Sequence, residues 1–153
     1  MPVKKIKDFL DKNAIKYISI SHSLAYAAQE IAASANIHGE ELAKTVIVKL
    51  DNKLAMAVLP ATKKVDLNLL KKVSGANQVV LPNEDEFKDA FPECDIGAMP
   101  PFGNLYGMEV FADESLAEDE KIAFNAGTHT ELIKMAYGDF VKLANPKVTK
   151  FSA

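Results

Sequence analysis

Apolar residues recur at helical spacing near both ends of the chain and in short runs between them. In residues 3–13, Val3, Ile6, Phe9 and Leu10 define one apolar face, which predicts an amphipathic helix. Further helices are predicted over residues 26–35, 66–73, 82–90 and 139–143. Short apolar runs predict strands at residues 17–20, 78–81, 108–111, 121–124 and 130–135.

The clearest local signal is a hairpin in the first half of the chain. Two apolar runs, residues 45–50 and 53–59, are separated only by Asp51 and Asn52. Because Asp and Asn tolerate positive φ, this pair predicts a tight two-residue turn. Pro60 is expected to end the second strand.

Several short strands with few long helices favour an α+β fold. We expect a mixed, mostly antiparallel, barrel-like sheet with helices packed outside it. A length of 153 residues suits one core of ordinary size, and the chain shows no internal repeat and no low-complexity linker. Residues 1–153 are therefore predicted to form a single domain.

The composition is that of an ordinary globular protein, with 48% hydrophobic and 25% charged residues. The apolar runs are short, and charges follow the first three residues, so we expect no membrane span and a cytoplasmic location. Cys94 is the single cysteine, and no Cys/His cluster has zinc-ligand spacing, so neither a disulfide nor a metal site is expected. No cofactor is expected either, because the Walker A and dinucleotide-binding patterns are absent from the sequence.

Charge is unevenly distributed, and all 18 basic residues are lysine. Residues 1–76 hold 12 lysines against 7 acidic residues, whereas residues 77–153 hold 6 lysines against 14 acidic residues. Lysine lacks the bidentate fork of arginine, so any contact with nucleic acid should be a loose backbone contact with weak sequence readout. We expect that contact mainly from the first half of the chain; the alternative is that the lysines are solvated faces of an acidic protein. Its lysines cluster in sequence at Lys63, Lys64, Lys71 and Lys72.

A glycine-proline loop follows the acidic helix. Pro100 and Pro101 fix φ and lack N–H donors, while Gly97, Gly103 and Gly107 admit close approach of the backbone. Such a loop is stiff and offers bare backbone at chosen points.

Four single side chains each allow a functional and a purely structural interpretation. Lys44 begins a strand, so its ammonium lies either at a functional sheet edge or at an ordinary solvated terminus. His22 points into a cleft or caps a turn, and His129 binds a ligand or forms local hydrogen bonds. Cys94 and His129 form a nucleophile and base, or Cys94 is a small structural residue.

Together these segments resemble the YbaK/ProX family of aminoacyl-tRNA deacylases, which also occurs as the editing domain inserted in bacterial prolyl-tRNA synthetases. The resemblance runs from about residue 22 to residue 143. The fold of the family is a compact α+β domain with a barrel-like sheet. The segments that carry it are Leu42-Ala43-Lys44-Thr45, Gly97-Ala98-Met99-Pro100-Pro101, and Phe124-Asn125-Ala126-Gly127 followed by His129.

The resemblance implies hydrolysis of the ester that joins a wrong, small amino acid to tRNA. Lys44 takes the role of the essential lysine of the family, and Gly97 belongs to the catalytic loop. The residues implied in substrate binding are His22, Ala98, Met99, Pro100, Pro101, Gly127 and His129. No side chain in this set is an obvious general base, so we expect the ribose 2′-hydroxyl of the substrate to orient or activate water.

The partner implied is the acceptor end of an aminoacyl-tRNA, with an aminoacyl-tRNA synthetase as a further candidate. The chain is expected to act as a freestanding editor. Two other classes stay open: a non-catalytic module that binds tRNA or a synthetase, and a small-molecule hydrolase on the same fold. Alanine, serine, threonine and cysteine all suit a pocket that is bounded by a glycine-proline loop.

Overall fold

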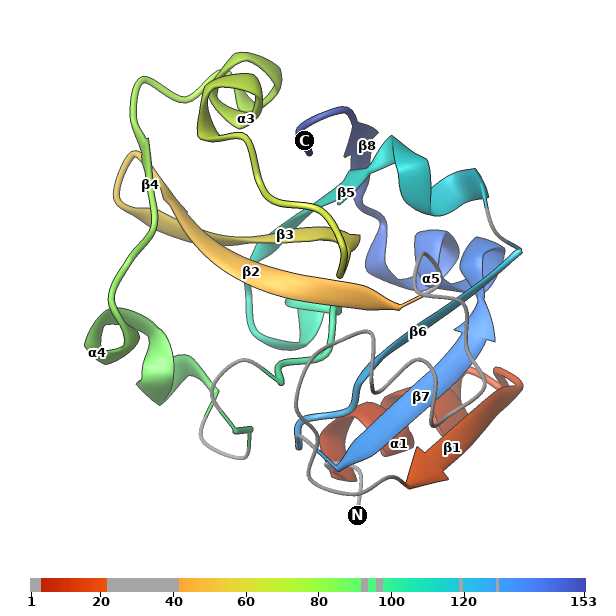
Figure 1. The fold of residues 1–153 in the computed structure, drawn as a ribbon. Coiled ribbons are helices and arrows are strands. Elements are labelled where there is room, and N and C mark those ends of the chain that lie inside the picture. The colour runs from red at the N-terminus through yellow and green to blue at the C-terminus, as the bar shows by residue number, and fades with distance from the viewer. Residues whose placement is uncertain (1–3, 22–41, 92–93, 96–97, 119, 129) are drawn as a thin grey trace.

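The computed structural model describes residues 4–21, 42–91, 94–95, 98–118, 120–128 and 130–153 (Figure 1). The helices are α1 (Lys4–Lys12), α3 (Leu67–Ser74), α4 (Glu84–Phe87) and α5 (Tyr137–Ala144). Three short 3-10 helices are η1 (Lys88–Ala90), η2 (Gly103–Leu105) and η3 (Glu114–Glu118). The strands are β1 (Tyr17–Ser21), β2 (Ala43–Leu50), β3 (Lys53–Pro60), β4 (Val79–Val80), β5 (Glu109–Asp113), β6 (Lys121–Asn125), β7 (Glu131–Ala136) and β8 (Lys147–Thr149). The helix predicted over residues 26–35 lies outside the described residues.

The strands form two sheets. One is three-stranded and antiparallel, in the order β1-β7-β6. The other is five-stranded, in the order β4-β2-β3-β5-β8. In that sheet β2 pairs antiparallel with β3 and β4, whereas β5 runs parallel to β3 and β8. The predicted fold class, a mixed and mostly antiparallel α+β sheet, is confirmed.

The two sheets meet at a parallel bridge between Leu42, just before β2, and Ala123 in β6. Both sheets turn one face toward a common hydrophobic core, which therefore lies inside a partly closed barrel. Phe102 is central in this core, with its ring 5.6 Å from Phe9, 5.7 Å from Phe124 and 5.7 Å from Phe140 between centroids. These edge-on contacts join α1, β6 and α5 to the glycine-proline loop.

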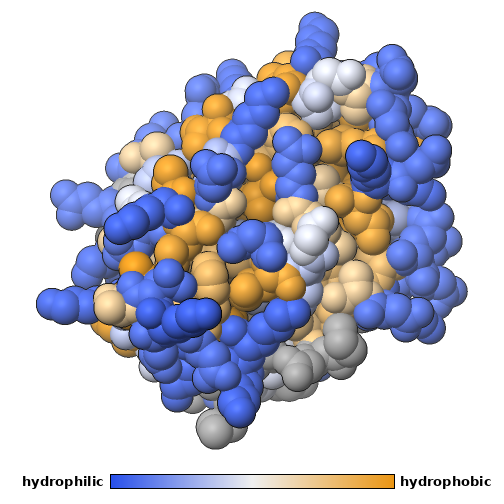
Figure 2. All heavy atoms as spheres, turned by 180° about the vertical axis from the view of Figure 1, so that it is seen from behind, coloured by the Kyte–Doolittle hydropathy of each residue, from blue (hydrophilic) through white to orange (hydrophobic). Residues whose placement is uncertain are grey.

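The helices take two kinds of position around the barrel. α3 packs outside the five-stranded sheet, where Leu70 joins Val48, Leu59 and Phe151 in a second buried cluster. α1 and α5 instead contribute buried residues to the core inside the barrel, which they close. Seen from behind, the molecule shows apolar residues between scattered hydrophilic side chains (Figure 2).

The hairpin forms as predicted. Asp51 and Asn52 have φ of 47° and 75°, which the short polar side chains of Asp and Asn accept more readily than most residues. The Asp51 carboxylate accepts hydrogen bonds from the backbone N–H groups of Asn77 (2.9 Å) and Gln78 (2.8 Å). The turn is thereby fixed to the segment that precedes β4.

Close contacts at Gly103 and hydrogen bonds to Asp113 hold two further segments in place. A Cβ added to Gly103 would collide with the carbonyl oxygen of Met108, so the backbone here approaches too closely for any other residue. Asp113 is 1% exposed and accepts hydrogen bonds from the N–H groups of Phe151 (3.0 Å), Ser152 (3.0 Å) and Ser115 (3.2 Å), and from the Ser115 hydroxyl. This buried carboxylate anchors residues 151–152 beside β5.

Candidate active site

Lys44 is the second residue of β2 and is half-buried. Side chains alternate between the two faces of a strand. Ala43 and Ile47 point into the core inside the barrel, so Lys44 shares the opposite face with Val46 and Val48. The lysine therefore lies on the outer face of β2, at the end of the strand where the two sheets meet.

The bridge between the sheets places a second polar side chain beside Lys44. β2 and β6 lie alongside each other, and Leu42 pairs in parallel with Ala123. Lys44 and Asn125 each lie two residues after this bridge, so they occupy equivalent positions on the same face. The side-chain oxygen Oδ1 of Asn125 is buried, and it has no hydrogen-bond partner in the described structure. A lysine and an asparagine from two different sheets thus occupy neighbouring positions at the junction.

The glycine-proline loop reaches this point through the backbone of Gly127. The N–H of Gly127 donates to the carbonyl of Ala98 (2.8 Å), and its carbonyl accepts from the N–H of Asp95 (2.7 Å). The N–H of Ala98 in turn donates to the carbonyl of Asp95 (3.0 Å). Gly127 has φ of 91°, in the left-handed region that favours glycine, so a larger residue would strain this contact. Two of the three sequence segments singled out above are therefore joined directly.

Residues 98–101 of the loop are buried. Ala98 is fully buried, Met99 is 4% exposed, and both prolines are buried as well. Met99 packs in the same core as Ala43 and Ala126, which lie in the other two segments. The side chains of residues 98–101 therefore fix the position of this part of the loop, and in these residues any contact with a ligand is left to the backbone.

The charge of Lys44 is perturbed by its surroundings. Burial lowers the pKa of the Lys44 ammonium below its ordinary value of 10.5, and the positive charge of Lys64 lowers this pKa further. Lys64 follows β3 in a turn where Ala61 donates to the carbonyl of Leu42 (2.7 Å). Its backbone is held on both sides by Ala153, with N–H to carbonyl distances of 3.0 and 2.9 Å. Two cations from separate segments thus face the same region.

The other predicted site residues are not all within the described structure. His22, Gly97 and His129 lie outside the described residues. The sequence alone did not single out Asn125, although the segment Phe124-Asn125-Ala126-Gly127 contains it. Glu131, the first residue of β7, is a buried carboxylate (7% exposed) whose backbone carbonyl accepts from the N–H of Ala126 at 3.0 Å. A polar residue that ends an apolar strand two residues before a glycine is the signal that would have pointed to Asn125.

The sequence profile of the aminoacyl-tRNA editing domain matches residues 22–143. The chain belongs to this family. The match covers the span over which the three segments resemble the family, so the predicted family is confirmed. Together Lys44, Asn125 and the Ala98–Gly127 backbone contact form the candidate active site of this editing domain.

Curated relatives of the editing domain are prolyl-tRNA ligases. One from Bacillus cereus (strain AH187) is 31% identical over 91 residues, which are 60% of this chain and 16% of the ligase. One from Bacillus mycoides (strain KBAB4) has the same identity and coverage. The chain therefore matches only a small part of the length of these relatives.

Solved structures share the fold of the editing domain along nearly the whole chain. A protein assigned as a trans-editing enzyme for prolyl-tRNA synthetase has a TM-score of 0.85 at 16% identity, covering 99% of this chain and 96% of that one. A hypothetical protein has a TM-score of 0.87 at 19% identity, covering 98% of this chain and 100% of the other. At these identities the likeness concerns the fold.

Three further features of the editing domain concern the surroundings of Cys94, metal binding and membrane-spanning helices. Cys94 Sγ lies 3.5 Å from the Tyr106 hydroxyl, so in this structure the thiol has a polar neighbour other than a histidine. In the described ranges, no group of three His, Cys, Asp or Glu residues could hold a metal ion. Among the same residues, no helix is both long and apolar enough to cross a membrane.

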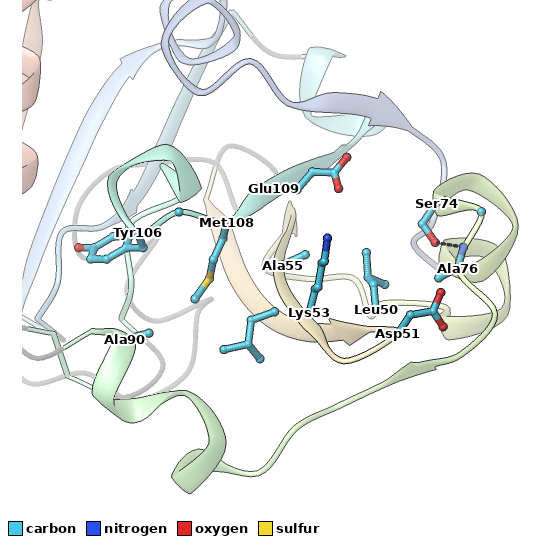
Figure 3. Close-up of a pocket in the computed structure, with 13 residues that line it drawn as sticks. Leu50, Asp51, Lys53, Ala55, Ser74, Ala76, Ala90, Tyr106, Met108 and Glu109 are labelled. Carbon is cyan, nitrogen blue, oxygen red and sulfur yellow. Dashed lines mark hydrogen bonds between the residues drawn. The ribbon is translucent and has the colours of Figure 1, made fainter.

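A hollow of about 800 Å³ lies at the other end of the hairpin (Figure 3). Lys53 and Glu109 are at its border, and Leu50, Ala55 and Met108 are among its apolar lining. Residues rise about 3.3 Å along a strand, so this end of β2 is roughly 20 Å from Lys44. None of the predicted site residues that the structure describes lines this hollow.

Proposed function

We propose that the editing domain is an aminoacyl-tRNA deacylase that hydrolyses the ester between tRNA and a wrongly attached small amino acid. The observation that carries this proposal is the meeting of the three family segments. The half-buried Lys44 lies across the sheet junction from Asn125. The glycine-proline loop is hydrogen-bonded to Gly127, two residues after Asn125. The arrangement suits an ester whose carbonyl oxygen becomes negatively charged during hydrolysis.

Lys44 would supply the positive charge in this reaction. Water attacks the ester carbon, negative charge develops on the carbonyl oxygen, and an ammonium in a partly desolvated position stabilises that charge more than one in bulk water does. The free amide oxygen of Asn125 would hold a hydroxyl or amino group of the substrate. Because no side chain of the set is an obvious base, the ribose 2′-hydroxyl would orient the water.

The glycine-proline loop would set the size of the pocket. Gly97 and the backbone of Ala98 would face the aminoacyl group, and His22 and His129 would line its surroundings. Because Met99, Pro100 and Pro101 are packed in the core, this wall cannot widen without disturbing the interior. Bulky amino acids would be excluded, and small ones would enter. Such a second site is needed because one binding pocket separates amino acids that differ by a methylene by only about 1–3 kcal/mol.

The partner of the domain would be the acceptor end of a mischarged tRNA in the cytoplasm. Its relatives are prolyl-tRNA ligases, so tRNA for proline is the first substrate to test, with prolyl-tRNA synthetase as a candidate partner. Residues 1–153 would form one editing domain that acts without a cofactor.

Release of labelled amino acid from mischarged tRNA tests this proposal. Alanine, serine, cysteine, threonine and phenylalanine would be attached in turn to tRNA for proline, and we expect release of small amino acids but not of phenylalanine. Lys44→Met keeps the packing of the side-chain stem and should slow release by about 100-fold or more. Lys53→Met, which removes an exposed lysine at the other end of the hairpin, is the matched control and should not slow it.

Two results would contradict the proposal. Binding of tRNA with no release of any amino acid would identify a non-catalytic binding module. Normal release by a folded Lys44→Met variant would remove Lys44 from the mechanism. Gly97→Ala adds a test of the loop, since it should abolish release of small amino acids while tRNA binding is retained.

A further inference from the structure

A turn after β3 lies beside the end of β2 that carries Lys44. Lys44 is paired with Leu59 in the strand register, and β3 ends one residue later. The N–H of Ala61 then donates to the carbonyl of Leu42 (2.7 Å), two residues before Lys44. In Figure 1 the chain leaves β3 at this point and continues to α3. Lys64, on this connection, is thereby kept at the Lys44 end of the hairpin.

The backbone of Lys64 is fixed by the last residues of the chain. Its N–H donates to the carbonyl of Ala153 (3.0 Å), and its carbonyl accepts from the N–H of Ala153 (2.9 Å). The N–H of Asp66 donates to the carbonyl of Phe151 (2.7 Å), and Phe151 is in turn held by the buried carboxylate of Asp113 (3.0 Å). The exposed side chain of Lys64 therefore projects from a firmly held backbone.

No acidic side chain neutralises the two lysines. The positive charge of Lys64 lowers the pKa of Lys44, so the two ammonium groups lie within range of direct charge interaction. In the described part of the structure, neither lysine forms an ion pair with a carboxylate. Asp66, which is close to Lys64 in sequence, accepts from N–H groups at the start of α3 instead. Two like charges that repel each other in this way favour an anion close to both.

The proposed substrate carries an anion at a suitable place. Its ester is attached to the ribose of the terminal adenosine of tRNA, and the 5′-phosphate of that nucleotide is the negative charge nearest to the ester. An ammonium acts as a compact point charge, so it can hold a phosphate oxygen without the planar fork of arginine. A half-buried lysine for the ester and an exposed lysine for the phosphate match the two ends of one nucleotide.

We propose that Lys64 binds the 5′-phosphate of the terminal nucleotide of tRNA and so positions the aminoacyl ester beside Lys44. This proposal rests on the proposed function. The charge of the phosphate does not change while the ester is hydrolysed, so Lys64 stabilises the bound substrate and the transition state equally. Loss of Lys64 should therefore raise KM and leave kcat nearly unchanged. Because every tRNA has this phosphate, the contact carries no choice among tRNAs.

The lysines that cluster in sequence are separated by the fold. Lys71 and Lys72 lie in the last turn of α3, whereas Asp66, two residues after Lys64, caps its first turn. The eight residues of this helix span roughly 12 Å. Lys72 is exposed and carries the same charge as Lys64, so it provides a matched control for a general effect of charge.

Binding of two small ligands tests the phosphate contact without turnover. Adenosine and adenosine 5′-(methyl phosphate) differ by a phosphodiester with one negative charge, and NMR titration of ¹⁵N-labelled protein gives the dissociation constant of each. The wild type should bind the phosphate ligand about 10-fold or more tightly than adenosine, as expected for a hydrogen bond between charged groups. Lys64→Gln should lose this preference, whereas Lys64→Arg and Lys72→Gln should retain it.

Kinetics with mischarged tRNA test the positioning role. For tRNA for proline that carries alanine, Lys64→Gln should raise KM by about 10-fold and change kcat by less than about 2-fold. Lys64→Arg, which keeps the positive charge, should restore most of the loss in KM. Lys72→Gln should leave both constants at the wild-type values.

The outcomes separate this proposal from the proposed function. Equal affinity of the wild type for the two ligands would overturn the phosphate contact, and so would an undiminished preference in folded Lys64→Gln. A fall in kcat without a rise in KM would place Lys64 in the chemical step and would also overturn the proposal. A preference that depends on Lys64, in a wild type that releases no amino acid, would support the contact and overturn the proposed function instead.

Discussion

Asp113 offers a stringent test of how the buried polar groups stabilise the fold. Asp113→Asn keeps the volume of the side chain but replaces one acceptor oxygen by an amino group. If the amide oxygen continues to accept from Phe151 and Ser152, the amino group faces the N–H of Ser115, and two donors oppose each other. The half-buried backbone N–H of Ser115 is then left without its partner.

The expected loss follows from these contacts. A buried donor left unpaired costs about 1–3 kcal/mol. The remaining bonds also lose their charge assistance, since bonds to an ionised acceptor are about twice as strong as neutral ones. We therefore expect Asp113→Asn to lower the free energy of unfolding by about 2–4 kcal/mol at pH 7, which is a large share of the stability of an ordinary domain.

The loss should depend on pH in a defined direction. Burial alone would raise the pKa of Asp113, but the hydrogen bonds from Ser115, Phe151 and Ser152 together hold it below its ordinary value of 3.8. A carboxyl with a lowered folded-state pKa stabilises the protein above its unfolded-state pKa, and this stabilisation is lost as pH falls through the folded-state pKa. The difference between the wild type and Asp113→Asn should therefore shrink below pH 3.8.

Urea unfolding measures both effects. The midpoint should fall in Asp113→Asn with little change in the slope of free energy against urea. Asp85→Asn is the control, because this exposed carboxylate pairs only with Lys88 at 3.1 Å among the described residues, and such pairs contribute about 0–1 kcal/mol. Equal midpoints for the two variants, or a difference that stays constant into acid, would refute the reasoning.

Three further predictions concern backbone fit and charge. Gly103→Ala should lower the free energy of unfolding by more than about 2 kcal/mol, because the added Cβ collides with a carbonyl oxygen. Gly107→Ala, at a position with φ of 68° and open space, should lower the free energy of unfolding by only about 1 kcal/mol. Equal urea midpoints for the two variants would contradict this prediction. Lys64→Gln should raise the pKa of Lys44, which NMR titration of ¹³C-methylated lysines would detect, and an unchanged pKa would show that the two charges do not interact. Asn52→Val should destabilise the protein by about 1–2 kcal/mol and Asn52→Gly should not, as judged by thermal unfolding; similar melting temperatures would argue against the left-handed turn.

Local patterns were sufficient to predict most elements. The hairpin followed from two apolar runs and an Asp-Asn pair, and α3 followed from helical spacing after Asp66, whose side chain accepts from the N–H groups of Asn68 and Leu69. These signals depend on residues close in sequence, so the chain displays them directly. The family was likewise predicted correctly, because its three segments keep their order and spacing.

Features that depend on distant residues were not predicted. β8 is short and has an exposed Val148, so no apolar run marks it, and it forms because β5 offers a parallel edge. The place of α1 and α5 over the barrel interior also required the tertiary arrangement. Asn125 became a site candidate only when the Leu42–Ala123 bridge placed its strand beside that of Lys44.

That bridge also has a mechanical consequence for the site. Lys44 belongs to one sheet and Asn125 to the other, and each is held by the hydrogen bonds of its own sheet. A small rotation of one sheet against the other would change the separation of the two side chains without breaking either set of strand pairings. The proposed activity should therefore decline under mild heating or low denaturant before the strands unfold, so deacylation assays would report loosening of the junction that secondary-structure spectroscopy does not register.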